Sequence, residues 1–220
     1  MSLPADRSVD AVLFDFGGVF TESPFAVAEK VGSDLGAEPG RLMEVVFGPY
    51  HDDTDHPWHR LERGELSLEL AREEIIALGV EHGLDADPFN ILALLAGSSG
   101  PRPELVDYVK RLHDTGYRTG IITNNAHEFR DAWKSMLPVD ELFDVVVDSS
   151  EVGMRKPNPD IFRYALDALD GQTAERAVFL DDYHGNVEAA VELGMHGILV
   201  GPDVRGALVE LAVLTAIAFP

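Results

Sequence analysis

The stretch AVLFDFGGVF, residues 11–20, decides the fold. Four apolar residues lead into Asp15, and two glycines, Gly17 and Gly18, follow shortly after it. A short, continuous apolar run of this kind is typical of a strand that is buried on both faces of a parallel sheet. The strand therefore carries a carboxylate into a glycine-rich turn, where the backbone has the freedom to bend.

Strand and helix patterns alternate along most of the remaining chain. Further strands are expected at 117–122, 143–147, 177–180 and 197–200, and helices at about 102–115, 126–137, 157–170, 184–194 and 203–214. This alternation predicts an α/β fold, in which a parallel sheet carries helices on both of its faces.

Residues 21 to 98 interrupt the alternation with helical spacing and no convincing strand. Ser23 and Ser67 are typical N-cap residues, and each precedes a stretch with helical periodicity. A helical segment of this length predicts a small α-helical domain at 21–98, inserted into a core formed by 1–20 and 99–220. The segment 97–101, GSSGP, has the composition of the linker that returns to the core.

Charge and composition exclude several classes of protein. The chain has 39 acidic residues against 17 Lys and Arg, which gives a net charge of −22 and argues against nucleic-acid binding. It has no cysteine, so disulfides and zinc thiolate sites are excluded. The sequence shows neither a membrane-spanning stretch nor an apolar signal core, and we expect a cytoplasmic location with no membrane partner. Whether the chain is a monomer or a homodimer stays open.

Polar residues follow four of the predicted strands, at the edge where parallel sheets bind ligands. They are a carboxylate, a hydroxyl with two amides, a lysine, and a pair of carboxylates: Asp15, Thr123, Asn124, Asn125, Lys156, Asp181 and Asp182. Each residue type alone is typical of a helix cap, a loop or a surface. Their order at successive strand ends indicates one site.

The set has the chemistry that phosphoryl transfer requires, which is an in-line nucleophile and positive charge around the transferred oxygens. Asp15 is the candidate nucleophile and would form an aspartyl-phosphate. Asp181 and Asp182 would repel each other unless a cation lay beside them. Mg²⁺ prefers oxygen ligands of this kind, so the sequence predicts Mg²⁺ as cofactor and a small phosphorylated molecule as substrate.

The chain resembles the haloacid dehalogenase-like hydrolase superfamily in four motifs. These are FDFGGV at 14–19, ITNN at 122–125, RKPNPDIF at 155–162 and FLDD at 179–182. The insert resembles the helical cap of this superfamily, and WHRLERGELS at 58–67 is similar to caps of relatives near the phosphatase domains of soluble epoxide hydrolases. The resemblance implies a Rossmann-like core, a helical cap over the site and Mg²⁺-dependent hydrolase activity, most often that of a phosphatase.

The resemblance also implies a role for each motif residue. Asp15, the backbone carbonyl of Gly17 and Asp182 would bind the metal, with Asp181 supporting them. Catalysis would rest on Asp15, Lys156 and Thr123, and the substrate would be bound by Thr123, Asn124, Asn125 and Lys156. Backbone N–H groups near Phe16 and Asn124 would supply further donors to phosphate oxygens.

Gly17 departs from the pattern of the superfamily. Most of its phosphatases carry an aspartate at this position, which protonates the leaving group, and such acid–base help is worth roughly 10²–10⁴-fold in rate. Three outcomes stay open: a substrate with a good leaving group, slow or absent turnover, or a proton supplied by the cap. Candidate donors in the cap are His51, His56, His59 and Glu62, in a stretch that we expect to be an exposed loop.

Alternative functions follow from the same residues. A 2-haloacid dehalogenase would also use Asp15, but it needs no Mg²⁺ and typically carries tyrosine where Gly17 stands. Phosphonate cleavage needs a lysine in the cap, where Lys30 is the only one. A non-catalytic module that binds phosphate or a metabolite is the third alternative, with Gly17 as the sign of lost activity.

Overall fold

The computed structural model describes residues 7–97 and 100–219. Five parallel strands form one sheet in the order β3-β2-β1-β4-β5. Their bounds are β1 Ala11–Phe14, β2 Arg118–Thr123, β3 Val145–Asp148, β4 Ala177–Asp181 and β5 His196–Leu199. The expected α/β fold with a parallel sheet is confirmed. The expected boundary between residues 98 and 99 lies outside the described residues.

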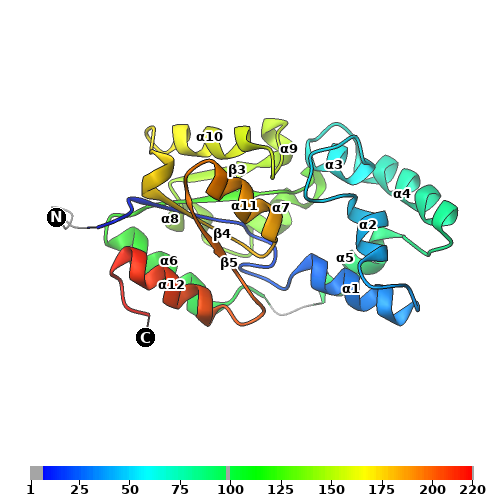
Figure 1. Ribbon diagram of the computed structural model, residues 1–220, viewed down its shortest axis with the longest axis horizontal. Coiled ribbons are helices and arrows are strands. Elements are labelled where there is room, and N and C mark those ends of the chain that lie inside the picture. Colours follow the sequence, from blue (N-terminus) through cyan, green and yellow to red (C-terminus); the bar gives the residue numbers. More distant parts are fainter. Residues whose placement is uncertain (1–6, 98–99, 220) are drawn as a thin grey trace.

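Helices cover both faces of the sheet (Figure 1). One face packs against α6 (Pro103–Asp114) and α12 (Arg205–Thr215), and the other packs against α10 (Pro159–Ala168) and α11 (His184–Glu192). Alternate residues of β1 belong to the two hydrophobic clusters, and all four are fully buried. The continuous apolar run of β1 therefore reflects burial on both faces.

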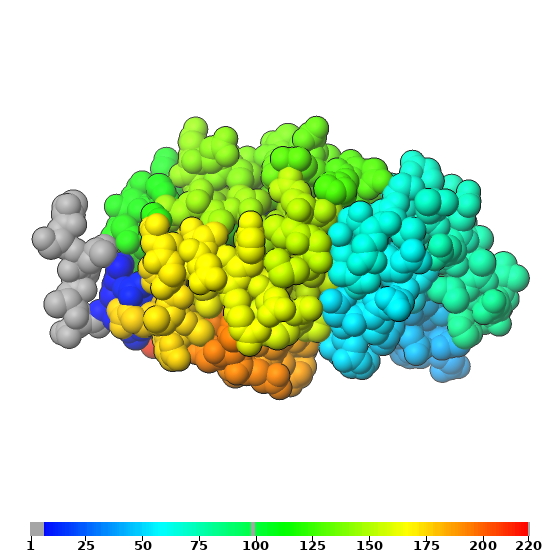
Figure 2. Space-filling model, turned by 90° about the horizontal axis from the view of Figure 1, so that it is seen from above, coloured from blue at the N-terminus to red at the C-terminus, as the bar shows by residue number. Residues whose placement is uncertain are grey.

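The five helices that follow β1 lie together at one end of the molecule (Figure 1), and we call them the cap. They are α1 Pro24–Asp34, α2 Arg41–Phe47, α3 Pro57–Glu62, α4 Leu68–His82 and α5 Pro88–Ala96. The hydroxyls of Ser23 and Ser67 accept backbone hydrogen bonds at the starts of α1 and α4, as N-caps do. The cap has a hydrophobic cluster largely its own and packs directly against the core (Figure 2).

Two local expectations about the core are wrong. The single helix expected at 126–137 is a 3₁₀ turn at His127–Phe129, then α7 (Arg130–Lys134) and, after Pro138, α8 (Val139–Leu142). A short helix, α9 (Ser149–Val152), follows β3 directly where none was expected. In the part of the chain that the structure describes, no helix is long and apolar enough to cross a membrane.

Candidate active site

Strand β1 lies at the centre of the sheet, so Asp15 emerges between the ends of β2 and β4. The Asp15 backbone N–H donates to the Leu180 carbonyl at 2.8 Å, which extends the pairing of β1 with β4 by one residue. Asp181 ends β4, and Asp182 follows it. The carboxyl edge of the sheet therefore brings the carboxylates of Asp15, Asp181 and Asp182 close together in space.

Lys156 joins two of these carboxylates. Its ammonium group lies 2.8 Å from Asp15 Oδ1 and 2.7 Å from Asp181 Oδ2, and the residue is 1% exposed. Burial alone would lower the pKa of Lys156, but the two carboxylates outweigh it and raise the pKa above its ordinary value. Lys156 therefore stays charged in a site that excludes most water.

Asn124 holds the backbone of Lys156 in place. The Asn124 side-chain oxygen accepts from the Lys156 backbone N–H at 2.8 Å, and its amide nitrogen donates to the Lys156 carbonyl at 3.0 Å. The same nitrogen donates to the Tyr50 hydroxyl in the cap at 3.1 Å. The Asn124 side chain is thus occupied by the protein itself.

One positive charge does not balance this cluster. Burial, and next the charge of Asp181, raise the pKa of Asp15 to about 7, although Lys156 opposes the rise. Burial and the neighbouring Asp181 and Asp15 raise the pKa of Asp182 well above its ordinary value. The two carboxyls therefore ionise fully at neutral pH only with a further cation beside them.

Asp182 has the free ligand atom for such a cation. Asp182 as a residue is partly exposed, but its Oδ1 is buried and has no hydrogen-bond partner among the described residues. Asp181 differs, because its Oδ1 accepts from the Tyr183 backbone at 2.7 Å and its Oδ2 accepts from Lys156 and Asn186. One carboxylate oxygen each from Asp15, Asp181 and Asp182 lies within 4.8 Å of the other two. The donor set fits a hard divalent cation.

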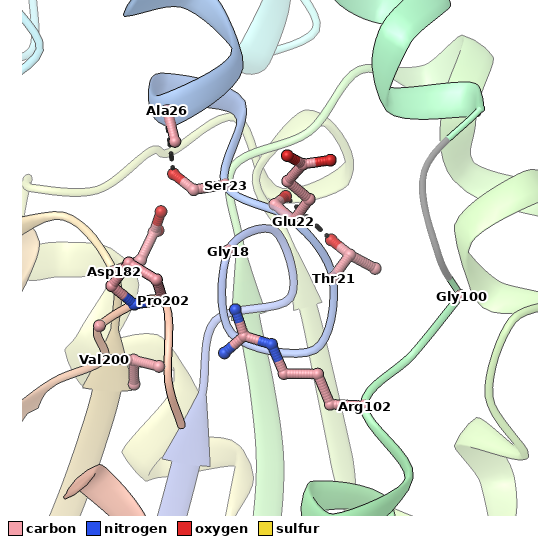
Figure 3. Close-up of a pocket in the computed structure, with 11 residues that line it drawn as sticks. Gly18, Thr21, Glu22, Ser23, Ala26, Gly100, Arg102, Asp182, Val200 and Pro202 are labelled. Atoms are coloured by element: carbon pink, nitrogen blue, oxygen red, sulfur yellow. Dashed lines mark hydrogen bonds between the residues drawn. The ribbon is translucent and has the colours of Figure 1, made fainter. Parts of the chain in front are cut away.

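Gly18 allows Asp182 to come this close. Its φ of 77° is in the left-handed region, and a Cβ atom there would lie 2.1 Å from Asp182 Cγ. A cavity of about 510 Å³ lies beside this contact. Its lining includes Gly18, Thr21 to Ser23, Arg102 and Val200 to Pro202. Figure 3 shows Ser23 next to the Asp182 carboxylate, and both residues line this cavity.

We expect Gly18→Ala to weaken Mg²⁺ binding and to lower kcat/KM by about 10²-fold, because the added methyl group displaces the Asp182 carboxylate. The matched control is Gly17→Ala, whose Cβ would meet only the Pro24 ring at 3.7 Å, an ordinary contact. Isothermal titration with Mg²⁺ compares the two variants. Equal Mg²⁺ affinity in both would show that the Gly18 contact does not position Asp182.

The cap closes over Asp15 and leaves a cavity of about 80 Å³. Gly17 and Asn124 line it from the core, beside Asp15 and Lys156. The remaining lining residues are Asn186 from the core and six residues of the cap and its entry: Pro24, Phe25, Phe47, Tyr50, Trp58 and Glu62. The cavity is far smaller than the 300–1,000 Å³ typical of ligand sites.

A buried ion pair joins the cap to the core above this cavity. Arg155 Nε donates to Glu62 Oε2 at 2.7 Å, and the two side chains are 0% and 4% exposed. Glu62 Oε1 accepts from the Tyr50 hydroxyl at 2.7 Å and from the Trp58 indole N–H at 2.8 Å. The sequence named Glu62 only as a proton source and gave Arg155 no role. The only feature of the sequence that pointed to a role for Arg155 was its position next to Lys156. That position does not identify its partner in the cap.

The histidines of the cap do not form one exposed group, so that expectation is wrong in part. His51 is exposed and lies 3.3 Å from Asp52. His56 accepts from the Trp58 backbone as the N-cap of α3, and His59 within α3 is fully buried against Thr54. Among the residues described, the cavity above Asp15 has no histidine in its lining. Of the four cap donors considered, the structure brings only Glu62 to the site.

His59 should make the protein sensitive to acid. Burial, and then the nearby charge of Arg155, lower the pKa of His59 to about 3 from an ordinary value of 6.5. The unfolded chain takes up this proton first, so the free energy of unfolding falls as pH drops from 6.5 toward 3. Between pH 7.5 and pH 5, the free energy of unfolding should fall by about 2 kcal/mol less in His59→Gln than in the natural protein, as measured by urea unfolding. The exposed His51→Gln is the control, and an equal effect there would contradict the assignment.

The remaining predicted residues, Thr123 and Asn125, do not line the cavity above Asp15. Thr123 ends β2 and is buried next to the site. The Asn125 backbone N–H donates to Ser149 Oγ at 2.9 Å, and its side-chain oxygen accepts from the Ala126 backbone at 2.8 Å. Asn125 therefore shapes the loop after β2, while Asp15, Gly17, Asn124 and Lys156 line one cavity.

These features define a capped α/β hydrolase. They are the parallel sheet, the carboxylates and lysine at its carboxyl edge, and the helical cap above them. Residues 9–194 match the model of the haloacid dehalogenase-like hydrolases. The chain belongs to this family of enzymes.

The chain is similar in sequence to several named proteins. The chain is 33% identical over 198 residues to Acyl-CoA dehydrogenase family member 10 of Mus musculus, covering 88% of the chain but 18% of that protein. It is 37% identical over 221 residues to Bifunctional epoxide hydrolase 2 of Mus musculus, covering 94% of the chain and 39% of that protein. It is 28% identical to Phosphatase MT3486 of Mycobacterium tuberculosis, covering 96% and 97% of the two chains.

Solved structures share the fold. A HAD family enzyme from Bacteroides thetaiotaomicron, in complex with magnesium and inorganic phosphate, matches with a TM-score of 0.60 at 20% identity and covers 90% of this chain and 98% of its own. A dehalogenase with an intermediate complex matches with a TM-score of 0.64 at 18% identity and covers 97% and 100%. Fold likeness thus includes both reaction types, and the choice between them rests on the site.

Proposed function

We propose that the protein is a Mg²⁺-dependent phosphatase that transfers the phosphoryl group of a small organic phosphate to Asp15. The observation that carries the proposal is the buried carboxylate cluster, in which Asp182 Oδ1 has no partner in the described part of the chain and Lys156 alone supplies positive charge. Displacement of halide from a haloacid needs no such cation site. The likeness to Phosphatase MT3486 over nearly its full length supports the same choice.

Each residue of the site has a role in this proposal. Asp15, Asp182 and the carbonyl of Gly17 would hold Mg²⁺, and Asp181 would orient Lys156 and Asn186 through its two oxygens. Bound Mg²⁺ would neutralise charge on the phosphate and on Asp15. Lys156, the Thr123 hydroxyl and the backbone N–H of Asn124 would stabilise the equatorial oxygens of the transferred group.

The reaction has two steps. An oxygen of Asp15 attacks phosphorus, the bond from phosphorus to the leaving group breaks, and an aspartyl-phosphate forms. Water then attacks this phosphorus, Asp15 is restored as a carboxylate, and the proton of the water ends on inorganic phosphate. Asn186 lines the cavity, and its Oδ1 is a buried acceptor with no partner among the described residues, so we assign it the role of holding that water.

Phosphate release tests the proposal. The protein is assayed with p-nitrophenyl phosphate, a panel of small metabolite phosphates and a 2-chloroacid, each with Mg²⁺ and with EDTA. We expect Mg²⁺-dependent phosphate release and no chloride release, and we expect Asp182→Asn to weaken Mg²⁺ binding in isothermal titration. Chloride release with EDTA present would make the protein a dehalogenase. Tight phosphate binding with no turnover would make it a binding module.

A further inference from the structure

The cavity above Asp15 contains few groups that can give a proton to a departing oxygen. Its titratable lining residues, within the described ranges, are Asp15, Tyr50, Glu62 and Lys156. Asp15 is the nucleophile of the proposed function. Lys156 directs its ammonium group at Asp15 Oδ1 and Asp181 Oδ2, at 2.8 and 2.7 Å. Tyr50 and Glu62 from the cap are therefore the two candidates for a general acid.

Glu62 has no proton to give. Its two oxygens accept three hydrogen bonds, from the Tyr50 hydroxyl, the Trp58 indole and the Arg155 guanidinium, at 2.7, 2.8 and 2.7 Å. A carboxyl group that faces three donors, one of them a buried guanidinium, is ionised. Glu62 therefore acts as an acceptor in this network.

Tyr50 is equally unsuited. Its hydroxyl donates to Glu62 and accepts from the Asn124 amide, so its one proton is committed to a carboxylate. Loss of that proton to a leaving group would place a phenolate against ionised Glu62 in a buried site. Burial, and then the charge of Glu62, raise the pKa of Tyr50 well above its ordinary value, in agreement with this geometry.

We infer that the enzyme acts on small phosphates whose leaving group departs as a stable anion without receiving a proton, the class to which acyl phosphates belong. The inference rests on the proposed phosphatase function. Asp15 attacks phosphorus, the bond from phosphorus to the acyl oxygen breaks, and both electrons of that bond leave with the carboxylate. Water and Asp15 then complete the second step as above, so no external acid is needed in either step.

The walls of the cavity agree with a small acyl group. Four aromatic side chains, Phe25, Phe47, Tyr50 and Trp58, face a space of about 80 Å³. Within the described ranges, the cap contributes no lysine or arginine to the lining of this cavity. A substrate with a second anionic group would meet an apolar wall and an ionised carboxylate, so the organic part should be short and uncharged.

Acetyl phosphate and ethyl phosphate test the inference directly, because they match closely in size and charge and differ in the acidity of the leaving group. We expect the ratio of kcat/KM for acetyl phosphate to that for ethyl phosphate to exceed the ratio of their uncatalysed rates by about 10²–10⁴-fold. This factor is the rate enhancement that a general acid usually supplies. Asp15→Asn supplies the background for spontaneous hydrolysis. A ratio no larger than the uncatalysed one would overturn the inference but leave the phosphatase proposal standing. No Mg²⁺-dependent turnover of either substrate would overturn both.

Variants at Gly17 and Tyr50 separate proton supply from other causes. In Gly17→Asp the new Cβ has ordinary contact with Pro24, and the added carboxyl can protonate the leaving oxygen. We expect this variant, but not Gly17→Asn of similar size, to raise turnover of ethyl phosphate relative to acetyl phosphate. Tyr50→Phe should leave the ratio of the two substrates unchanged. Selective loss of ethyl phosphate turnover in Tyr50→Phe would identify Tyr50 as a proton donor and overturn the inference.

Discussion

Replacement of Asp15 by asparagine is expected to abolish turnover, with kcat falling by roughly 10⁴–10⁶-fold, as when other enzymes lose their nucleophile. The amide keeps the shape of the side chain but cannot attack phosphorus. Mg²⁺ binding should weaken as well, since one charged ligand is lost. Phosphate release from acetyl phosphate, measured with Mg²⁺ present, gives the size of the effect.

The same variant should be more stable than the natural protein when no metal is bound. The pKa of Asp15 is raised from 3.8 to about 7, so folding disfavours its ionised form. The free energy of unfolding of the metal-free protein therefore falls as pH rises from about 4 to about 7, and Asp15→Asn lacks this fall. A higher melting temperature for Asp15→Asn in EDTA at pH 8 is the expected sign. Asp160→Asn, at an exposed position, is the control for this stability measurement. For the turnover prediction, activity above a few per cent in Asp15→Ala would rule Asp15 out as nucleophile.

Arg155→Met is expected to destabilise the protein by about 3–5 kcal/mol, because it leaves the buried Glu62 carboxylate without its ion partner. The melting temperature should drop by about 2–4 °C for each kcal/mol in a chain of this length. Arg163→Met removes the exposed ion pair with Asp160 and should cost less than about 1 kcal/mol. Urea unfolding of both variants makes the comparison.

A double-mutant cycle sharpens this prediction. Arg155→Met combined with Glu62→Met replaces both charges by apolar groups, and its cost should be smaller than the sum of the single costs. Additive costs would show that the two side chains stabilise the fold separately. In that case the cap would be held to the core by its apolar contacts and not by the ion pair.

The sheet was predictable because each strand has a short apolar run, and because β-α alternation leaves few topologies open. The ends of β1, β2 and β4 follow from the same pattern, and with them the positions of Asp15, Thr123 and Asp181. The starts of α1 and α4 were predictable from Ser23 and Ser67, since a capping hydroxyl acts within its own turn.

Contacts between distant segments were not predictable in this way. Arg155 and Glu62 are 93 residues apart, and nothing in either local pattern marks one as the partner of the other. His59 was expected in an exposed loop, because its neighbours are mostly polar, but the fold of the cap turns it inward as part of α3. The closeness of Asp182 to Gly18 depends in the same way on how two loops meet.

The buried ion pair above the cavity has a consequence for timing. In the proposed reaction, exchange of substrate and product would require the cap to lift, and this motion would separate Arg155 from Glu62 and Tyr50 from Asn124. Each cycle of the proposed reaction would then expose this ion pair to water and bury it again. For acetyl phosphate, whose leaving group needs no proton, we expect a long dwell in the closed form and product release as the slowest step.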